Sequence, residues 1–554
     1  MIRILLATLL LNLLTACNAE DVNEADGVPE TIPVVYDVAD TPWTTLQGVW
    51  KPKTPTADVL KAIADDPSLI TDITRYDELG LGIEFGDGEP WQEYTDLAPG
   101  YAAWATTNTS ADTKSLLYFW QAADEQIIDE ESPIRYAGVW NLVVGSSYRP
   151  NGHLTTQTFD AHVRTANRIA AASSRGFDFG IVTGDLTDGG QQNELDWFIT
   201  LMSGGVVDPD SGVNDDPIPG PGNDFNDPFT AEGLNAPWFA VVGNHETLYI
   251  GSGIVNDTIA QAAISDTVFT DALCEGLGVC IDPTDGLSPG FRRGDTPDAA
   301  VVTSGRTPAD PKRRILTLPE VLTALQQAPG EPEGHGMTAE DAANGIGDFS
   351  FYPIEGAPIR VIALNTIYRN EMGLDDLTEY SLGFMTTDQL TWLKDELDAA
   401  AAAGELVIIA SHHRSSDFNS NSPVSGKQLA TTLASYGNVV LHITGHGHYS
   451  AMQICTADGS APCADANGVN AGSGYWELMM PSTADFPLQS RIIELAYEGS
   501  RYLTIYVTNI DDNAPPGSLA HEARKLAAGR RFFYDDLYNE SYTHRAAVPI
   551  LQVH

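Results

Sequence analysis

The sequence predicts a protein of the α/β class, in which helices pack on β-sheets. From about residue 115 onward, short apolar runs alternate with amphipathic helical patterns, which is the order expected of that class. The composition, 43% hydrophobic and 9% aromatic, is that of a folded globular protein. A chain of 554 residues is long enough for a sizeable core and for about two to four domains.

The apolar runs have the length of strands, and turn residues or helical patterns bound them. The run PWFAVV at 237–242 is typical of a strand buried on both faces. The clearest helix is expected over 386–403, because Thr386 and Gln389 suit a capping box and Gly404 ends the pattern. The expected strands are 115–120, 177–182, 237–242, 360–364, 405–410, 438–441 and 501–507, and the other expected helices are 160–175 and 519–527.

Composition also divides the chain along its length. Residues 18 to about 40 are acidic and poor in aromatic side chains, as in a tether, and an extension of uncertain fold continues to residue 112. Two stretches rich in Gly and Pro interrupt the strand–helix pattern and are expected to be long loops or disordered segments. The predicted parts are a signal peptide (1–17), a tether with N-terminal extension (18–112), a main domain (113–512) with insertions at about 204–236 and 251–345, and a C-terminal extension (513–554).

The charge balance is strongly acidic. The chain has 29 Lys and Arg residues against 76 Asp and Glu residues, a formal net charge of −47. Such a surface has no basic field to bind long nucleic acids, so they are excluded as partners. It also repels anionic substrates at long range, so a phosphate site needs a strong local positive centre.

The N-terminus predicts export. Arg3 precedes an apolar core at 4–14 that is too short to span a membrane as a mature helix. The following Leu14-Thr15-Ala16-Cys17 resembles the bacterial lipoprotein box, which implies cleavage before Cys17 and lipid on its thiol. The expected location is therefore a membrane anchor on the periplasmic side or the cell surface. An ordinary secretory signal, with Cys17 incidental, is the alternative.

Four cysteines remain, in two close pairs. In an exported chain such pairs favour local disulfides, here Cys274–Cys280 and Cys455–Cys463. Neither pair has partner ligands at the spacing of a zinc finger.

Polar side chains follow five of the expected strands, always at the same end. Ligands bind at this edge of open α/β sheets, and separate turns would not explain all five positions. Carboxylate, imidazole and amide groups together suit two metal ions such as Mn, Fe, Co or Zn. Two ions about 3.5–4 Å apart lower the pKa of bound water and clamp both oxygens of a displacement at phosphorus. The residues are Asp124 and Gln126, Asp185, Asn244 and His245, His412, and His446 and His448.

The order of these residues resembles the calcineurin-like metallophosphoesterase family over about residues 124–448. The motifs that carry the resemblance are Asp124-x-Gln126, Gly184-Asp185, Gly243-Asn244-His245-Glu246, His412 and Gly445-His446-x-His448. The resemblance implies a four-layer α/β/β/α sandwich, with two packed mixed β-sheets flanked by helices and the dinuclear site at strand ends. The main domain at 113–512 would then be the catalytic domain.

The resemblance also implies a role for each residue. Asp185 would bridge the two ions, and a metal-bridging hydroxide would attack phosphorus in line. His245 would donate to a phosphate oxygen or protonate the leaving group. The catalytic set would be His245, Asp185 and Asn244. One ion would take Asp124, Gln126 and His448, and the other would take Asn244, His412 and His446.

One position departs from the family pattern, which has His where this chain has Gln126. An amide oxygen is a weaker ligand than imidazole, so the affinity and identity of the first metal stay open, and Gln126 could instead hydrogen-bond to a ligand. His413 could replace His412, since either can face inward at a strand end. Arg135 and Arg414 are expected to be surface or ion-pair residues rather than phosphate contacts, and Trp476 and Arg491 are expected to complete a sheet rather than border the substrate cleft.

These observations predict an exported, lipid-anchored hydrolase of small phosphate esters. Whether it is a phosphomonoesterase (a phosphatase) or a phosphodiesterase is left open, because the two insertions decide how much of a second ester group fits. A non-catalytic surface binding protein with a degenerate metal site is the alternative, and only Gln126 favours it.

Overall fold

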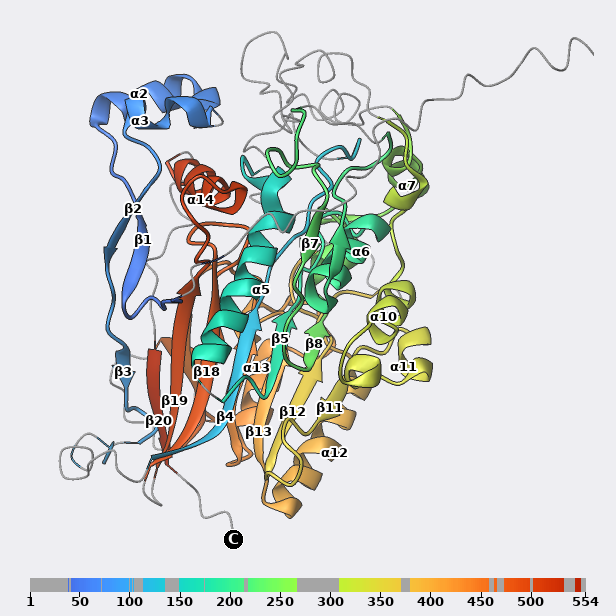
Figure 1. Ribbon diagram of the computed structural model, residues 1–554. Helices are drawn as coiled ribbons and strands as arrows, with labels where there is room; N and C mark the ends of the chain where they lie inside the picture. Colours follow the sequence, from blue (N-terminus) through green and yellow to red (C-terminus); the bar gives the residue numbers. More distant parts are fainter. Residues whose placement is uncertain are drawn as a thin grey trace, which may run out of the picture.

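The architecture is described from a computed structural model (Figure 1). It describes residues 38, 41–70, 72–98, 100, 101, 103, 113–134, 149–173, 175–213, 218–266, 308–369, 379–457, 463–465, 473–498, 502–532 and 544–549. The fold is mixed α/β, with two seven-stranded mixed sheets flanked by helices, and this confirms the predicted fold class. In the described part of the chain, no helix is both long and apolar enough to cross a membrane.

The first sheet comes mainly from the second half of the main domain. Its four central strands are parallel, and the strands at its margins are antiparallel. Its order is β11 (Phe349–Phe351), β12 (Ile359–Leu364), β13 (Leu406–Ser411), β14 (Val439–Thr444), β17 (Tyr475–Met479), β15 (Ala451–Cys455) and β16 (Cys463–Asp465). Cys455 and Cys463 face each other across β15 and β16 and form the predicted disulfide.

The second sheet brings distant parts of the chain together. β4, β5 and β8 are parallel, and β3 is parallel to β20, whereas β18 runs antiparallel to β4 and β19, and β19 runs antiparallel to β20. Its order is β3 (Gln92–Tyr94), β20 (His544–Pro549), β19 (Tyr502–Asp511), β18 (Gln489–Glu498), β4 (Thr113–Ala122), β5 (Phe179–Thr183) and β8 (Trp238–Val241). β3 and β20 lie outside residues 113–512, so the sheet extends beyond the predicted main domain at both ends. The domain limits themselves stay a prediction.

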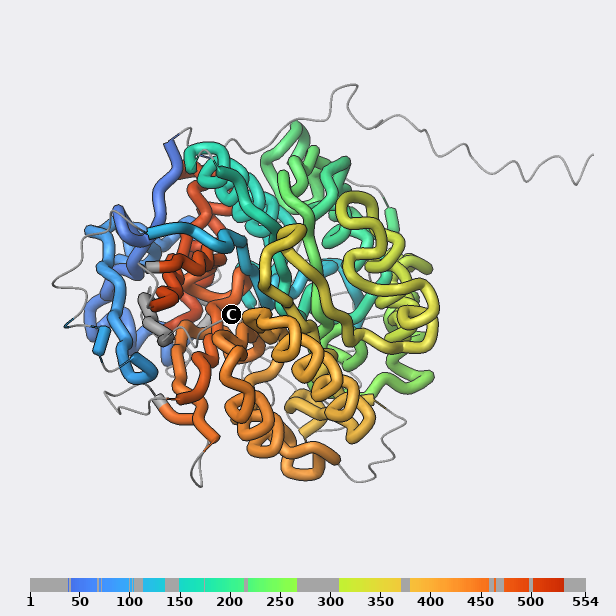
Figure 2. The backbone as a smooth tube through the Cα atoms, turned by 90° about the horizontal axis from the view of Figure 1, so that it is seen from below, coloured from blue at the N-terminus to red at the C-terminus, as the bar shows by residue number. Residues whose placement is uncertain are grey.

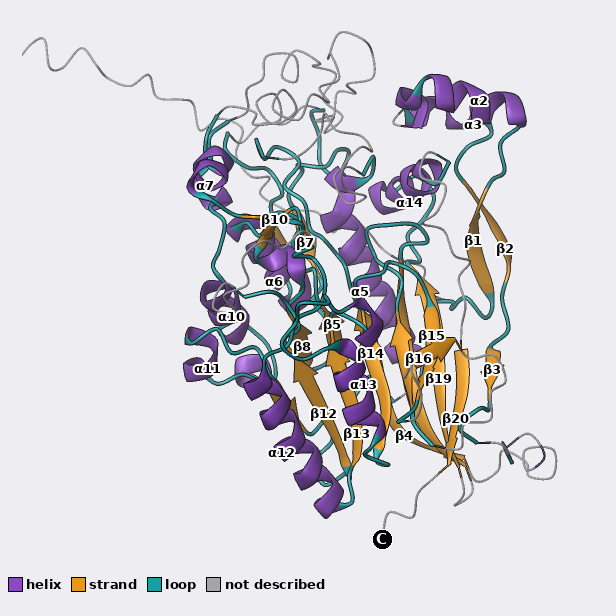
Figure 3. Cartoon of the chain, turned by 180° about the vertical axis from the view of Figure 1, so that it is seen from behind, coloured by secondary structure: helices purple, strands orange, loops and turns teal. Residues whose placement is uncertain are grey.

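Helices cover the outer faces of the two sheets. α5 (Thr155–Ala172) and α6 (Gln192–Ser203) lie on the second sheet, in front in Figure 1. α12 (Thr387–Ala403) and α13 (Gly426–Ala434) lie on the first sheet, in front in Figure 3. Figure 2, seen from below, places the teal segment that contains α5 and the orange segment that contains α12 and α13 on opposite sides.

Strand alternation explains why both faces of the first sheet are apolar. In β13, Ile408 and Ala410 belong to the core that includes the second sheet, whereas Val407 and Ile409 belong to a core with Leu393 of α12. Successive side chains of a strand point to opposite faces, so a strand between two layers must be apolar throughout. This burial produces the continuous apolar runs seen in the sequence.

The expected caps of α12 are present. Thr386 accepts a hydrogen bond from the backbone of Gln389, and the Gln389 side chain accepts one from the backbone of Thr386. Gly404 ends the helix in the left-handed conformation, at φ 71°. Both predictions from the capping pattern are confirmed.

The N-terminal extension packs against the C-terminal helix. Apolar side chains of both join one core, which includes Ile63, Tyr76 and Leu526. The extension contains β1 (Gly48–Pro52), paired with β2 (Ile83–Asp87), and the helices α2 (Ala57–Asp65) and α3 (Tyr76–Leu79); the C-terminal helix is α14 (Leu519–Arg530).

The two insertions contain more regular structure than the expected long loops. Their strands are only two or three residues long, too short to show alternation, and a capping box between Thr317 and Glu320 starts a helix in a Pro-rich region. Cys274 and Cys280 lie outside the described residues. The elements are β6 (Gly205–Val207) paired with β7 (Phe229–Ala231), β10 (Gly253–Ile254), α7 (Asp257–Ala263), α10 (Leu318–Gln326) and α11 (Ala339–Ala343). β10 pairs with β9 (Leu248–Tyr249), which lies just before the second insertion.

Candidate metal centre

The residues predicted for the metal site lie together where strands of both sheets end. The end of β5 meets the end of β13, because Nδ1 of His412 lies 2.8 Å from the carbonyl oxygen of Thr183. The end of β4 meets the end of β14, because the backbone N–H of His446 donates to both carboxylate oxygens of Asp124, at 3.0 and 3.1 Å. The two sheets thus bring their parallel strand ends to one place, as the sequence predicts.

Asp185 lies at the centre of this group. Its Oδ2 is 3.3 Å from Nε2 of His412 and accepts a hydrogen bond of 3.2 Å from the Nε2 amide of Gln126, so one oxygen contacts residues of both predicted groups. The hydrogen bond to a ligand that the sequence left open for Gln126 is therefore present. Oδ1 of Asp185 accepts a hydrogen bond of 2.9 Å from the backbone of His245. The carboxylate is therefore held at the boundary between two groups of ligands.

The first of these groups contains Asn244, His412 and His446. Oδ1 of Asn244 lies 3.0 Å from Nε2 of His412 and 3.1 Å from Nδ1 of His446. The Asn244 amide nitrogen donates to the carbonyl of Gly251 at 2.8 Å, which fixes the oxygen toward the two rings.

The second group contains Asp124, Gln126 and His448. Nε2 of His448 lies 3.1 Å from Oδ1 of Asp124. Oε1 of Gln126 is buried and has no hydrogen-bond partner among the described residues. A buried amide oxygen without a partner is costly, and a cation at this place would satisfy it.

These distances fit a metal site. Ligand atoms about 2.0–2.2 Å from one ion lie about 3 Å from each other when they are at right angles, close to the separations between the groups above. The ligand atoms of Asp124, Asp185 and His412 all lie within 4.8 Å of one another, as a cluster that holds a metal ion requires. In the described part of the chain, neither Asp124 nor Asp185 pairs with Lys or Arg, so their buried charge calls for another cation.

The backbone at the site is strained. Five of the predicted ligands have positive φ, which non-glycine residues seldom adopt, and such strain concentrates at functional sites. Among the described residues only three other non-glycine positions, Ile250, His335 and Leu488, share this conformation. The five are Asp124 (φ 55°), Gln126 (41°), Asp185 (58°), His446 (70°) and His448 (59°).

The imidazoles and carboxylates of the site shift each other's pKa values. Burial raises the pKa of Asp185, but His412 and His245 outweigh burial and hold that pKa well below its usual range. Burial lowers the pKa of His412 and His448, but the carboxylates Asp185 and Asp124, respectively, raise each pKa to about 9. A metal ion would replace the protons on His412 and His448, so its binding releases protons.

The third imidazole ligand, His446, behaves differently. Burial, together with the nearby His412, lowers the pKa of His446 to about 4. This ring is therefore already in the neutral form that binds a metal ion at neutral pH.

His245 lies beside these ligands. Its Nδ1 is 2.7 Å from the backbone carbonyl of Asp188, so Nδ1 carries the hydrogen and Nε2 faces Asp185, 3.8 Å from Oδ2. Glu246 fixes the same turn, because its carboxylate accepts hydrogen bonds from the backbones of Asp185, Thr187 and Gly243. The site thus contains a histidine that can move a proton without being a predicted ligand.

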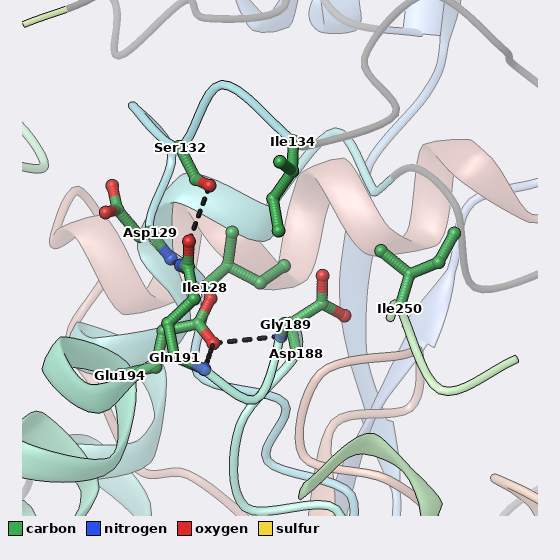
Figure 4. Close-up of a pocket in the computed structure, with 9 residues that line it drawn as sticks. All are labelled: Ile128, Asp129, Ser132, Ile134, Asp188, Gly189, Gln191, Glu194 and Ile250. Atoms are coloured by element: carbon green, nitrogen blue, oxygen red, sulfur yellow. Dashed lines mark hydrogen bonds between the residues drawn. The ribbon is translucent and has the colours of Figure 1, made fainter. Parts of the chain in front are cut away.

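The loop that carries Asp188 is held from below by Glu194. Figure 4 shows the Glu194 carboxylate accepting hydrogen bonds from the backbones of Gly189 and Gln191, at 2.9 and 3.2 Å. The adjoining cavity, lined by Asp188, Ile134 and these residues, has a volume of about 10 Å³. That is room for about one water molecule and too little for a phosphate ester.

The alternatives raised by the sequence have clear positions in the structure. Both ring nitrogens of His413 have partners, Thr366 and the carbonyl of Ser381, at 3.0 and 2.8 Å, whereas Nε2 of His412 points to the site. Arg414 pairs with Asp417. Trp476 of β17 and Arg491 of β18 are fully buried, each in its own sheet. Arg135 and Cys17 lie outside the described residues.

Three residues at the site were not predicted from the sequence. Asp485 contacts His448, Arg149 contacts both Asp188 and Asp485, and Arg530 contacts Asp485. Each lies in a region without a motif, so the sequence has no pattern that identifies them.

No protein-family model matches the chain, and no curated protein matches it in sequence. Among solved structures, the chain is similar to a crystal structure of a dimetal phosphatase from Danio rerio, at 12% identity and a TM-score of 0.35. The match covers 72% of this chain and 99% of that one. A likeness at this TM-score carries no conclusion about this chain, so the function is inferred from the site alone.

Proposed function

We propose that the protein hydrolyses small phosphate esters with the help of two metal ions. The observation that supports this most directly is the position of Asp185, with one carboxylate oxygen facing both Gln126 and His412. A carboxylate that serves two ligand groups is the arrangement that a dinuclear site requires.

Each ion would be held by one of the two groups. Asp124, Gln126 and His448 would hold one, Asn244, His412 and His446 would hold the other, and Asp185 would contact both. When bound, the ions supply positive charge to the phosphate and lower the pKa of water there. They also provide the local attraction that a chain of net charge −47 otherwise lacks.

His245 would donate a proton to the leaving group. The hydrogen on its Nδ1 is fixed by the Asp188 carbonyl, so Nε2 is the atom that holds or gives a proton toward the site. Asn244 would serve as a ligand through its oxygen, which the hydrogen bond from its amide to Gly251 holds in place. The substrate we propose is a small phosphate ester, a class that includes nucleotides and phospholipid fragments.

The test is metal content together with turnover. The protein without residues 1–17 is loaded separately with Mn, Fe, Co and Zn and assayed on p-nitrophenyl phosphate and bis-p-nitrophenyl phosphate. About two ions per chain and turnover that disappears in Asn244→Ala would establish the enzyme, and the preferred ester would separate monoesterase from diesterase. Asn438→Ala is the matched control, because its amide donates to the Glu405 carbonyl at the start of β13.

Other outcomes are equally informative. Bound metal without turnover on either ester would favour the non-catalytic binding protein. No bound metal under any condition would refute the assignment of the site.

Export and attachment through lipid on Cys17 are also proposals, supported only by the N-terminal sequence. Mass spectrometry of the mature protein from a bacterial membrane fraction tests them. The expected N-terminal residue is a lipid-modified Cys17, and an unmodified N-terminus elsewhere would contradict the anchor.

A further inference from the structure

The loop that follows β17 reaches the metal centre through Asp485. This carboxylate is buried, at 7% exposure, and its Oδ2 lies 2.6 Å from Nδ1 of His448. Its Oδ1 accepts a hydrogen bond of 3.1 Å from Nε of Arg149 and another from Arg530 of α14. Two guanidinium groups thus keep Asp485 charged and in place, and the carboxylate keeps the hydrogen of His448 on Nδ1.

The same loop holds a second ligand. Oγ of Ser482 donates to the backbone carbonyl of Asp124 at 2.7 Å and accepts from the backbone of Asp485 at 3.0 Å. The segment 482–485 therefore fixes two of the three residues in the group that contains Gln126.

The two metal-binding groups differ in how their histidines are supported. Nδ1 of His412 lies against the neutral carbonyl of Thr183, whereas Nδ1 of His448 lies against a carboxylate. A carboxylate at this position makes an imidazole a stronger metal donor than a carbonyl does. The stronger support occurs in the group whose third ligand is the weaker amide, Gln126.

We propose that Asp485 is a positioning residue that compensates for Gln126, so that binding of the metal ion held by Asp124, Gln126 and His448 depends on it. This rests on the proposed function, because it presumes two ions. Asp485 holds Nε2 of His448 toward Asp124 and strengthens the imidazole as a donor, which offsets the weak amide ligand. The other ion, held by Asn244, His412 and His446, does not depend on Asp485.

The test titrates Asp485→Asn and the wild type with Co²⁺ in the presence of a competing chelator. This titration measures the Co²⁺ affinity of each of the two metal sites. In the variant the affinity of one site falls by about 10–100-fold and the other stays unchanged. The matched control is Asp160→Asn, which removes another buried carboxylate that pairs with an arginine, Arg164 of α5. The control keeps both affinities, whereas equal losses at both sites in Asp485→Asn would overturn the proposal.

A double-mutant cycle tests the compensation itself. Replacing Gln126 by His supplies the imidazole, so Asp485→Asn costs much less affinity in the Gln126→His background than in the wild type. An equal loss in both backgrounds would refute compensation. If Asp485→Asn does not fold, the hydrogen bond between His448 and Asp485 is tested in the zinc-loaded wild type. The measurement is the proton NMR shift of the ring N–H groups of its ¹⁵N-labelled histidines. Two ring N–H groups lie against carboxylates, that of His448 and that of His442 beside Glu477, and both should resonate downfield of those bonded to carbonyls. Assignment separates them, and absence of the downfield His448 signal overturns the proposal.

The two proposals fail in different ways. A wild type that binds fewer than two ions refutes the dinuclear enzyme before Asp485 is considered. A wild type that binds two, with both affinities unchanged in Asp485→Asn, refutes only the role of Asp485.

Discussion

The backbone at Gly251 leaves no room for a side chain next to His245. Gly251 has φ +68°, and a Cβ there would lie 2.1 Å from Nε2 of His245 and 2.8 Å from Nδ2 of Asn244. To reach an ordinary contact of 3.4 Å, the imidazole must retreat by about 1.3 Å. A misplacement of about 1 Å costs on the order of 10²-fold in rate, so Gly251→Ala should lower kcat by about that factor.

Gly176→Ala is the control that introduces backbone strain without the clash expected in Gly251→Ala. Gly176 has φ +77°, and no atom lies within 4 Å of the place that a Cβ would take, so alanine there is strained but touches nothing. Gly176→Ala should lose about 1–2 kcal/mol of unfolding free energy from strain alone. Gly251→Ala should lose at least as much because of its clash, and only Gly251→Ala should lose turnover. The assays are chemical denaturation and kcat on the preferred p-nitrophenyl ester. Turnover of Gly251→Ala within a few-fold of the wild type, or an equal loss in Gly176→Ala, would refute the reasoning.

Three further substitutions give expected outcomes. Asp185→Asn should lose bound metal and reduce kcat by at least about 10²-fold, because even residues that only support ligands cost 10–100-fold; metal analysis and kinetics check it. Thr386→Ala removes the cap of α12 and should lower the unfolding free energy by about 1 kcal/mol in urea denaturation. Burial lowers the pKa of His162 to about 4, so its neutral form stabilises the fold above pH 6.5, and this stability is lost as the pH falls toward 4. The loss is about 3 kcal/mol at most, and His162→Gln should remove that part of the pH dependence of unfolding.

The strand ends were predictable because each apolar run stops where the chain leaves the sheet. Ile181 and Val182 are fully buried, and the first carboxylate after them, Asp185, lies at the site. The same logic applies to Ile443 of β14, which is followed by His446. A polar residue directly after a buried parallel strand can lie only at one edge of the sheet, so sequence order alone places it.

The supporting residues could not be found this way. Arg149 and Asp485 are 336 positions apart in the chain, and no local pattern connects them. Their contact exists only because β18 follows the Asp485 loop and pairs with β4, a pairing between distant segments. Likewise, the three-residue strands of the β6–β7 pair are too short for a period of two to appear.

The strain and charge at the site imply that metal binding stabilises the fold. Without metal, Asp124 and Asp185 are buried, their ion pairs within the described part of the chain are with imidazoles, and their backbones are left-handed. Ions that bind the native state alone stabilise it by mass action, by about 2.7 kcal/mol at a free concentration 100 times Kd. Mn²⁺ or Zn²⁺ should therefore raise the Tm of the metal-free wild type in a concentration-dependent way. Asp185→Asn, which lacks the carboxylate that faces both groups, should show a much smaller rise. No rise in the wild type, or the same rise in the variant, would mean that the clustered carboxylates do not form a metal site.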